Sequence, residues 1–318
     1  MTQNNTALVF PGQGSQIVGM GKDLNDNFNS AKEVFQIVDD ILNIKLSDII
    51  FNGPSDELVK TQNTQPALMA VSMAIIKIIE KDFGIKTYDL CSIVAGHSLG
   101  EYSALATANS ISISDAAKLL QIRGSAMAEC AQKTQGAMAA ILNADYNKIK
   151  NIVNEASQNG DICQIANDNS IGQIIISGSV AAIDNAIAIA KENGIRKAIK
   201  LPVGGAFHSE LMFDAKKEMA EILSKTEIKK PEIKFINNIS ANFIDDPENI
   251  KNSLIEQITG QVRWRETMLL MQKNNIKNIV EIGSGKVLSG LASRTCKDFN
   301  AISIQNIEDI ESFLKNNS

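Results

Sequence analysis

Histidine is scarce in this chain, which has two among 318 residues, His97 and His208. Cysteine is scarce and scattered, with no C-x-x-C pair, at positions Cys91, Cys130, Cys163 and Cys296. This distribution indicates neither a zinc site nor a disulfide framework, so we expect no bound metal. Unpaired cysteines are typical of a reducing compartment, and we therefore expect a cytoplasmic protein.

Long apolar runs are also missing. The longest uncharged one covers residues 67–76, which is too short to cross a bilayer. Residues 1–10 have neither a basic segment nor a long apolar core. The sequence therefore predicts no export signal and no association with a membrane.

Positive charge is in deficit, because 31 Lys and Arg residues stand against 36 Asp and Glu, giving a net charge of -5. No dense basic block occurs, so we expect no nucleic acid partner and infer a small molecule or a protein as ligand. What the chain has in quantity is apolar residues, at 44%. These can fill one large domain, or a large and a small one.

The stretch Gly96-His97-Ser98-Leu99-Gly100 follows a short apolar run at residues 93–95 and precedes an Ala- and Leu-rich segment that suits a helix. Strand, sharp turn and helix are the context of a nucleophile elbow, in which two glycines let the strand and the helix approach closely. The serine hydroxyl then stands exposed above the sheet. A tight glycine turn with an idle serine is the alternative interpretation.

The order of patterns suggests two domains. Residues 136–202 follow the order strand, helix, strand, strand, helix, strand, which is that of a split-βαβ, ferredoxin-like unit. Strands and helices alternate on either side, which predicts a mostly parallel sheet covered on both faces. We therefore predict an α/β fold with a large domain over 1–134 and 204–318 and a small subdomain over 135–203.

Three local predictions concern element boundaries. Residues 48–55 resemble a turn region, and Pro66 suits the first turn of a helix over 66–81. Ser114 is predicted to cap a helix that ends near Lys133.

A serine hydroxyl needs a nearby base, and histidine is the usual one. His97 directly precedes Ser98 in the turn, so its side chain should leave in another direction and shape the pocket. His208 lies in a glycine-containing turn just after the small subdomain, where the chain returns to the main sheet. It is the better candidate base. No pattern singles out an acidic residue to orient it, and a main-chain carbonyl could do so.

An oxyanion formed at Ser98 needs main-chain N–H donors. In an elbow one donor comes from the next residue, which here is Leu99. The loop Gly12-Gln13-Gly14 ends the first predicted strand at the same sheet edge, and we choose Gln13 as the second donor.

Arg123 stands on an otherwise apolar helical segment, 25 residues after the candidate nucleophile. A guanidinium there must find an anion or reach solvent. It could be an ordinary salt-bridged arginine. If it faces the pocket, its planar fork suits the carboxylate of an acyl group that carries a free acid.

Several blocks in one order resemble the malonyl-CoA:acyl carrier protein transacylases of fatty acid synthesis over nearly the whole length. The blocks are Phe10-Pro11-Gly12-Gln13-Gly14-Ser15-Gln16, Gln65-Pro66-Ala67, Gly96-His97-Ser98-Leu99-Gly100-Glu101, Arg123-Gly124-x-x-Met127, Gly205-Ala206-Phe207-His208-Ser209, Gln257 with Val262-Arg263-Trp264, and Glu281-Ile282-Gly283-x-Gly285-Lys286-Val287-Leu288. Many relatives have proline where this chain has Ser284, a difference that concerns a turn and not the chemistry.

This resemblance implies an α/β-hydrolase-like large domain and a ping-pong transfer of malonyl from malonyl-CoA to the carrier's phosphopantetheine thiol through Ser98. It implies His208 as base and Arg123 as ligand of the malonyl carboxylate. Gln13 and Leu99 would supply the oxyanion amides, and the main-chain carbonyl of Gln257 would orient the histidine. The residues implied to line the acyl pocket are Gln65, His97, Met127 and Phe207.

Malonyl-CoA and acyl carrier protein are the expected partners, the chain is expected to be a monomer, and no cofactor is expected because both thioesters enter as substrates. Two other functions stay open. One is a serine esterase or thioesterase, against which the absence of an HGGG loop and the presence of Arg123 count. The other is a carrier-docking module without catalysis.

Overall fold

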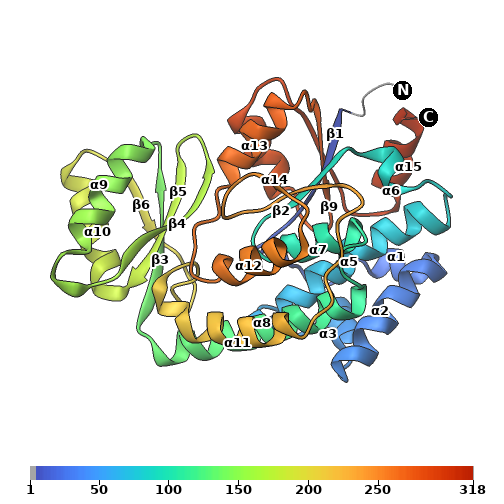
Figure 1. The fold of residues 1–318 in the computed structure, drawn as a ribbon, viewed down its shortest axis with the longest axis horizontal. Helices are drawn as coiled ribbons and strands as arrows, with labels where there is room; N and C mark the ends of the chain where they lie inside the picture. Colours follow the sequence, from blue (N-terminus) through green and yellow to red (C-terminus); the bar gives the residue numbers. More distant parts are fainter. Residues whose placement is uncertain (1–4, 318) are drawn as a thin grey trace.

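The computed structural model describes residues 5–317. Its larger sheet has six strands in the order β10-β9-β1-β2-β7-β8, of which all but β8 run parallel. Strands β1, β2 and β9 of this sheet are labelled in Figure 1. The strands are β1 (Thr6–Phe10), β2 (Ile93–Gly96), β7 (Lys234–Ile236), β8 (Phe243–Ile244), β9 (Asn278–Ile282) and β10 (Asn300–Ile304). The predicted mostly parallel α/β sheet is confirmed, and the short antiparallel β8 was not predicted.

Alternate side chains of β1 enter two different cores, because successive strand residues point to opposite faces of a sheet. Leu8 and Phe10 pack into one apolar cluster, whereas Ala7 and Val9 pack into another. Both faces of the sheet are therefore covered. The helices around it are α1 (Lys22–Asn27), α2 (Asn29–Leu42), α3 (Leu46–Asn52), α4 (Ser55–Leu58), α5 (Thr61–Lys81), α6 (Thr87–Leu90), α7 (Gly100–Thr107), α8 (Ile113–Lys133), α11 (Phe213–Ser224), α12 (Pro247–Gln257), α13 (Trp264–Lys273), α14 (Val287–Thr295) and α15 (Ile307–Asn317).

Three local predictions are wrong. The segment 48–55 is mostly helical, as the end of α3 and the start of α4. Helix α5 begins at Thr61, so Pro66 lies inside it; the side chains of Asn63 and Thr64 donate to carbonyls at the end of α4 and fix the earlier turn. Helix α8 is capped by Ser112, whose hydroxyl accepts from the N–H of Asp115 at 3.0 Å.

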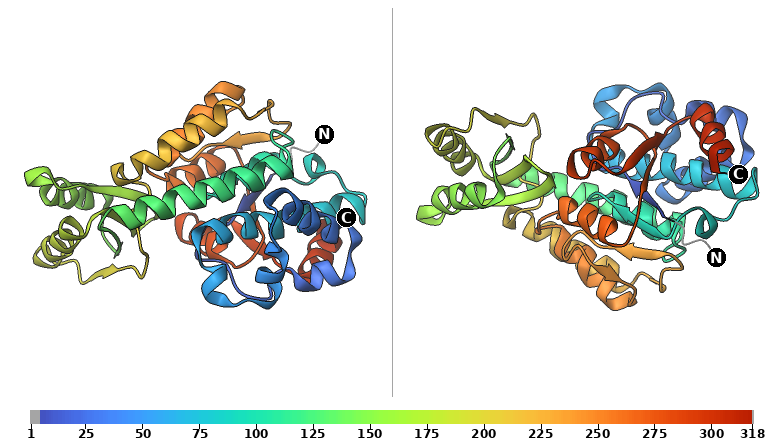
Figure 2. Two further views of the ribbon diagram at one scale, coloured as in Figure 1. Left: turned by 90° about the horizontal axis from the view of Figure 1, so that it is seen from below. Right: turned by 90° about the horizontal axis from the view of Figure 1, so that it is seen from above.

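The smaller sheet is antiparallel, with strands in the order β4-β5-β3-β6. Its elements are β3 (Gly136–Leu142), α9 (Tyr146–Ala156), β4 (Cys163–Ser170), β5 (Gln173–Ser179), α10 (Val180–Glu192) and β6 (Lys197–Lys200). Element order and strand order together are those of a split-βαβ unit. Figure 2 shows this unit projecting from one end of the molecule, with α8 running toward it. The domain limits stay predictions.

Strand β4 also contacts the large domain, at the loop between α12 and α13. The N–H of Asp168 donates to the carbonyl of Val262 at 2.9 Å, and the N–H of Val262 donates to Ala166 at 2.8 Å. The buried carboxylate of Asp168 pairs with the guanidinium of Arg265 on α13 at 2.7 Å. The small unit is thus fixed against the segment that follows Gln257.

Within residues 5–317, the structure contains no helix that is both long and apolar enough to span a membrane.

Candidate active site

Ser98 stands in a tight turn between β2 and α7 at the carboxyl edge of the parallel sheet. A Cβ added to Gly96 would lie 1.9 Å from the carbonyl oxygen of Gly100, and one added to Gly100 would lie 2.3 Å from the carbonyl oxygen of Phe10. No side chain fits in either place, which explains both glycines. Ser98 itself has a φ of 54°, the left-handed conformation that a nucleophile elbow imposes.

The His208 imidazole contacts the Ser98 hydroxyl. Its Nε2 lies 2.9 Å from the Ser98 Oγ, and its Nδ1 lies 2.8 Å from the main-chain carbonyl oxygen of Gln257. Because a carbonyl oxygen can only accept, Nδ1 carries the proton when the ring is neutral. Nε2 then holds the lone pair that can receive the hydroxyl proton, as a general base requires.

The ring is in its neutral form at physiological pH. Burial, followed by the positive charge of Arg123, lowers the pKa of His208 to about 3. Within residues 5–317, no carboxylate forms a hydrogen bond to the ring. The acceptor that orients it is the Gln257 carbonyl. The ring is therefore oriented without an adjacent negative charge.

Arg123 enters the same site from α8 and is almost completely buried, at 1% exposure. One terminal nitrogen donates to the Gln65 Oε1 at 2.8 Å. The other donates to the Ser98 Oγ at 3.1 Å and to the Gln257 Oε1 at 2.8 Å, while the Nε is buried without a partner within the described residues. A buried guanidinium therefore contacts the Ser98 hydroxyl.

Two main-chain donors lie beside the elbow. The N–H groups of Leu99 and Gln13 donate to no acceptor in the described part of the chain. The loop after β1 packs directly on the turn, since a Cβ added to Gly12 would lie 2.9 Å from the His97 carbonyl oxygen. The two N–H groups come from the segments expected to form an oxyanion hole.

The four residues expected to line the acyl pocket have different neighbours. Gln65 accepts from the guanidinium through its Oε1, and its Nε2 lies 3.8 Å from the Met127 sulfur. The His97 Nε2 lies 2.8 Å from the Asn169 Oδ1 of β4, and its ring packs on Trp264. Phe207 packs with apolar residues of both the large core and the small sheet.

Sequence reasoning assigned no role to Asn238, which fixes the turn. Its Oδ1 accepts from the N–H of Ser98 at 2.8 Å, and its Nδ2 donates to the carbonyl of Gly96 at 2.7 Å. Glu101 was also missed; its buried carboxylate accepts from the N–H of Asn238 at 2.5 Å and from the Gln257 side chain. The available signal for Asn238 was its position, two residues after the end of β7 at the carboxyl edge.

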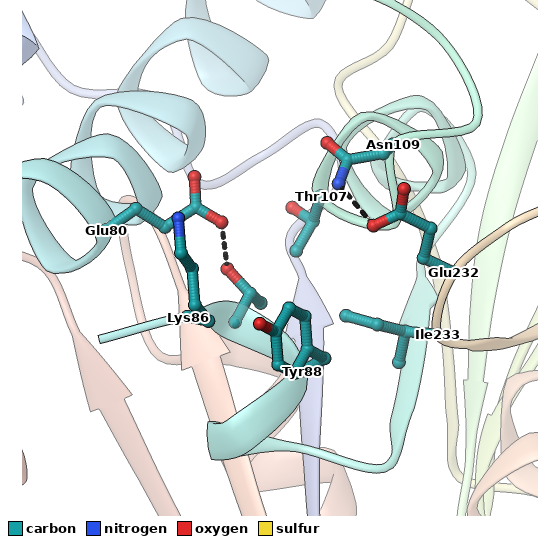
Figure 3. Close-up of a pocket in the computed structure, with 8 residues that line it drawn as sticks. Glu80, Lys86, Tyr88, Thr107, Asn109, Glu232 and Ile233 are labelled. Atoms are coloured by element: carbon teal, nitrogen blue, oxygen red, sulfur yellow. Dashed lines mark hydrogen bonds between the residues drawn. The ribbon is translucent and has the colours of Figure 1, made fainter. Parts of the chain in front are cut away.

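A cleft of about 280 Å³ lies elsewhere, with Glu80, Lys86, Tyr88 and Glu232 among the residues that line it (Figure 3). Thr87 and Ile233 in its wall precede β2 and β7, so it lies at the opposite edge of the sheet. It contains none of the residues described above.

The chain matches the family model described as an acyl transferase domain over residues 7–313. It is 41% identical to a Malonyl CoA-acyl carrier protein transacylase of Bacillus subtilis, with 96% of this chain and 95% of that protein covered. For the Haemophilus influenzae protein of the same name, the identity is 38%, with coverages of 97% and 98%.

Solved structures agree with these relatives. An acyl-carrier-protein-S-malonyltransferase from Bartonella henselae superposes with a TM-score of 0.94 at 46% identity, with 98% of each chain covered. A malonyl-transacylase in complex with a type II PKS acyl-carrier protein gives 0.93 at 35% identity, with coverages of 98% and 99%.

Proposed function

Since the chain belongs to the acyl transferase family and, within it, to the malonyl CoA-acyl carrier protein transacylases, we propose that Ser98 carries the malonyl group between the two thiols as an ester. The enzyme is an acyltransferase that moves malonyl from coenzyme A to acyl carrier protein. The observation that carries this proposal is that the Ser98 hydroxyl contacts both the neutral His208 ring and the buried Arg123 guanidinium.

In the first half-reaction, the Ser98 oxygen attacks the thioester carbonyl while His208 Nε2 takes the hydroxyl proton. The carbonyl oxygen becomes an oxyanion, which the N–H groups of Leu99 and Gln13 stabilise. The intermediate collapses, the bond to sulfur breaks, and the imidazolium returns its proton to the departing CoA thiolate. The Gln257 carbonyl holds the ring in the orientation that both transfers need.

In the second half-reaction, the phosphopantetheine thiol of the carrier protein gives its proton to His208 and attacks the malonyl ester. The ester bond breaks and the Ser98 oxygen recovers the proton. Both acyl donors and acceptors are thioesters or thiols that enter as substrates, so this sequence uses no resident cofactor.

Selectivity for malonyl follows from the position of Arg123. In a malonyl thioester one methylene separates the carboxylate from the reacting carbonyl, so the carboxylate must lie close to the Ser98 oxygen. The guanidinium is within 3.1 Å of that oxygen and is fixed by Gln65 and Gln257. Its two terminal nitrogens can turn toward the carboxylate as a bidentate pair. Met127, His97 and Phe207 would border the acyl group.

The acyl carrier protein partner is supported by the names of the relatives and by the solved complex. We further propose that one chain suffices as a monomer, because the nucleophile, base, guanidinium and orienting carbonyl all come from it. A reducing, cytoplasmic setting agrees with its four buried free cysteines.

A serine hydrolase with water as acceptor is not favoured, because the relatives over nearly the full length are transacylases. The two activities differ in the fate of the acyl-enzyme. We expect incubation with radiolabelled malonyl-CoA to label Ser98 stably and the label to move to a carrier thiol. The Ser98→Ala variant is the matched control and should take up no label. Rapid release to water would support a hydrolase, and label on Ser98→Ala would place the nucleophile elsewhere.

A further inference from the structure

Glu101 is a buried carboxylate inside the site that the acyl-transfer steps do not use. It lies in the first turn of α7 and is 0% exposed. The N–H of Asn238 donates to its Oε1, and the Nε2 of Gln257 donates to its Oε2. Burial of a carboxylate is costly unless it is paired or neutralised, so this group calls for an explanation.

The Gln257 amide connects Glu101 to Arg123. Its nitrogen donates to Glu101 and, at 3.0 Å, to the carbonyl of Ser98, while its oxygen accepts from Arg123 at 2.8 Å. The reverse orientation would place an N–H against the guanidinium and an oxygen against two acceptors. Glu101 therefore fixes the amide whose oxygen holds Arg123.

The charges of Glu101 and Arg123 act on one another, although no direct ion pair joins them within residues 5–317. The charged or titratable groups that interact with Glu101 are Arg123 from α8 and Tyr102 beside it on α7, whereas His208 interacts with Arg123 and His97. Burial raises the pKa of Glu101 to about 8, although the Asn238 N–H, the Arg123 charge and the Gln257 amide lower it. Arg123 is the one cation that this set provides at physiological pH.

We propose that Glu101 acts on malonyl recognition through Gln257: in the free enzyme the ionised form of Glu101 is coupled to the buried Arg123, and this form takes up a proton from solvent as the malonyl carboxylate binds. The inference rests on Arg123 binding that carboxylate. Two carboxylates beside one buried cation leave an excess negative charge, which favours protonation of the one that stays in the protein. Glu101 is thus a positioning residue, with no contact to the reacting atoms.

Proton uptake makes the affinity for malonyl-CoA depend on pH. With the Glu101 pKa near 8, the affinity should be nearly constant below neutral pH and fall by about tenfold per pH unit above 8. The number of protons taken up should rise from about a tenth at pH 7 to most of one at pH 9. Acetyl-CoA has no carboxylate to compete with Glu101, so its binding should take up none.

Isothermal titration calorimetry on the Ser98→Ala chain tests this, because binding is then measured without acyl transfer. Malonyl-CoA and acetyl-CoA are titrated at pH 7, 8 and 9, each in two buffers with different ionisation enthalpies. We expect the proton uptake given above with malonyl-CoA only. Malonyl-CoA binding without proton uptake would overturn the role of Glu101 alone. If malonyl-CoA bound no tighter than acetyl-CoA, the premise about Arg123 would fail as well.

Glu101→Gln in the same background is the second variant, with its fold checked by circular dichroism. It should bind malonyl-CoA with no proton uptake and with an affinity that stays flat from pH 7 to 9. The same uptake in this variant would assign the proton to another group and refute the proposal. If the variant does not fold, the comparison of the two thioesters on Ser98→Ala still decides.

Discussion

Replacement of Arg123 by alanine should abolish the preference for malonyl over acetyl donors. The guanidinium can give the malonyl carboxylate two charge-assisted hydrogen bonds, each worth about 1.5–3 kcal/mol. Losing both removes about 3–6 kcal/mol of transition-state binding, or roughly a factor of 10² to 10⁴ in kcat/KM for malonyl-CoA. Acetyl-CoA offers no partner for those bonds and should keep its rate much better.

The ratio of kcat/KM for malonyl-CoA to that for acetyl-CoA is the quantity to measure. Loss of the contacts from Arg123 to Gln65, Gln257 and the Ser98 hydroxyl affects both donors, so it cancels in the ratio. Arg123→Lys is the matched control: it keeps a charge without the fork, and its ratio should lie between the other two. A ratio within threefold of the parent in Arg123→Ala, with an unchanged melting temperature, would refute the assignment.

Three other changes test the site. Asn238→Ala should lower the free energy of unfolding by about 1–3 kcal/mol and reduce kcat, because it leaves the buried Ser98 N–H and Gly96 carbonyl unpaired. The control Asn242→Ala, at an exposed position, should do neither. Equal urea midpoints for the two variants would contradict the role of Asn238. Gly100→Ala should prevent folding or lower the melting temperature sharply, since its Cβ would overlap the Phe10 carbonyl. The control Gly290→Ala inside α14 should be tolerated, because its added Cβ would lie 3.6 Å from the nearest atom, on the Arg294 side chain. A normal melting temperature for Gly100→Ala would show that the elbow can open. His208 has a folded pKa of about 3 and an unfolded pKa of about 6.5, so its contribution to the free energy of unfolding is complete above pH 6.5 and is lost as pH falls toward 3, by about 2 kcal/mol at pH 5. Between pH 7 and pH 5, urea unfolding should show a smaller loss of this free energy for His208→Gln than for the parent chain. An equal loss in the two chains would argue against a buried neutral ring.

The sequence alone permits prediction of the elbow and the base because the chain restricts the choices. Gly96 and Gly100 flank a serine between an apolar strand and a helix, and that context specifies a turn. With two histidines in the whole chain, and one of them in the turn itself, His208 is reached by elimination. The split-βαβ order is also visible, because strand and helix periods alternate clearly over residues 136–202.

The residues that orient the Ser98 turn and the His208 ring show no recognisable sequence pattern. The acceptor for His208 is a main-chain carbonyl, which every residue possesses, so Gln257 could be named only from the family resemblance. Asn238 and Glu101 are 137 residues apart and meet only through folding. Pro66 misled the prediction of where α5 begins, since its missing N–H suits a first turn; side-chain bonds from Asn63 and Thr64 to α4 start the helix earlier.

The chain forms the small sheet between Ser98 and His208. Ser98 precedes β3, and His208 follows β6, so the whole insert separates these two contacting residues in the sequence. The contacts from β4 to Val262 and Arg265 hold the insert against the segment that follows Gln257. If the insert detached first in mild denaturant, turnover would stop while the six-stranded sheet stayed folded. Loss of activity would then report detachment of the insert from the large domain.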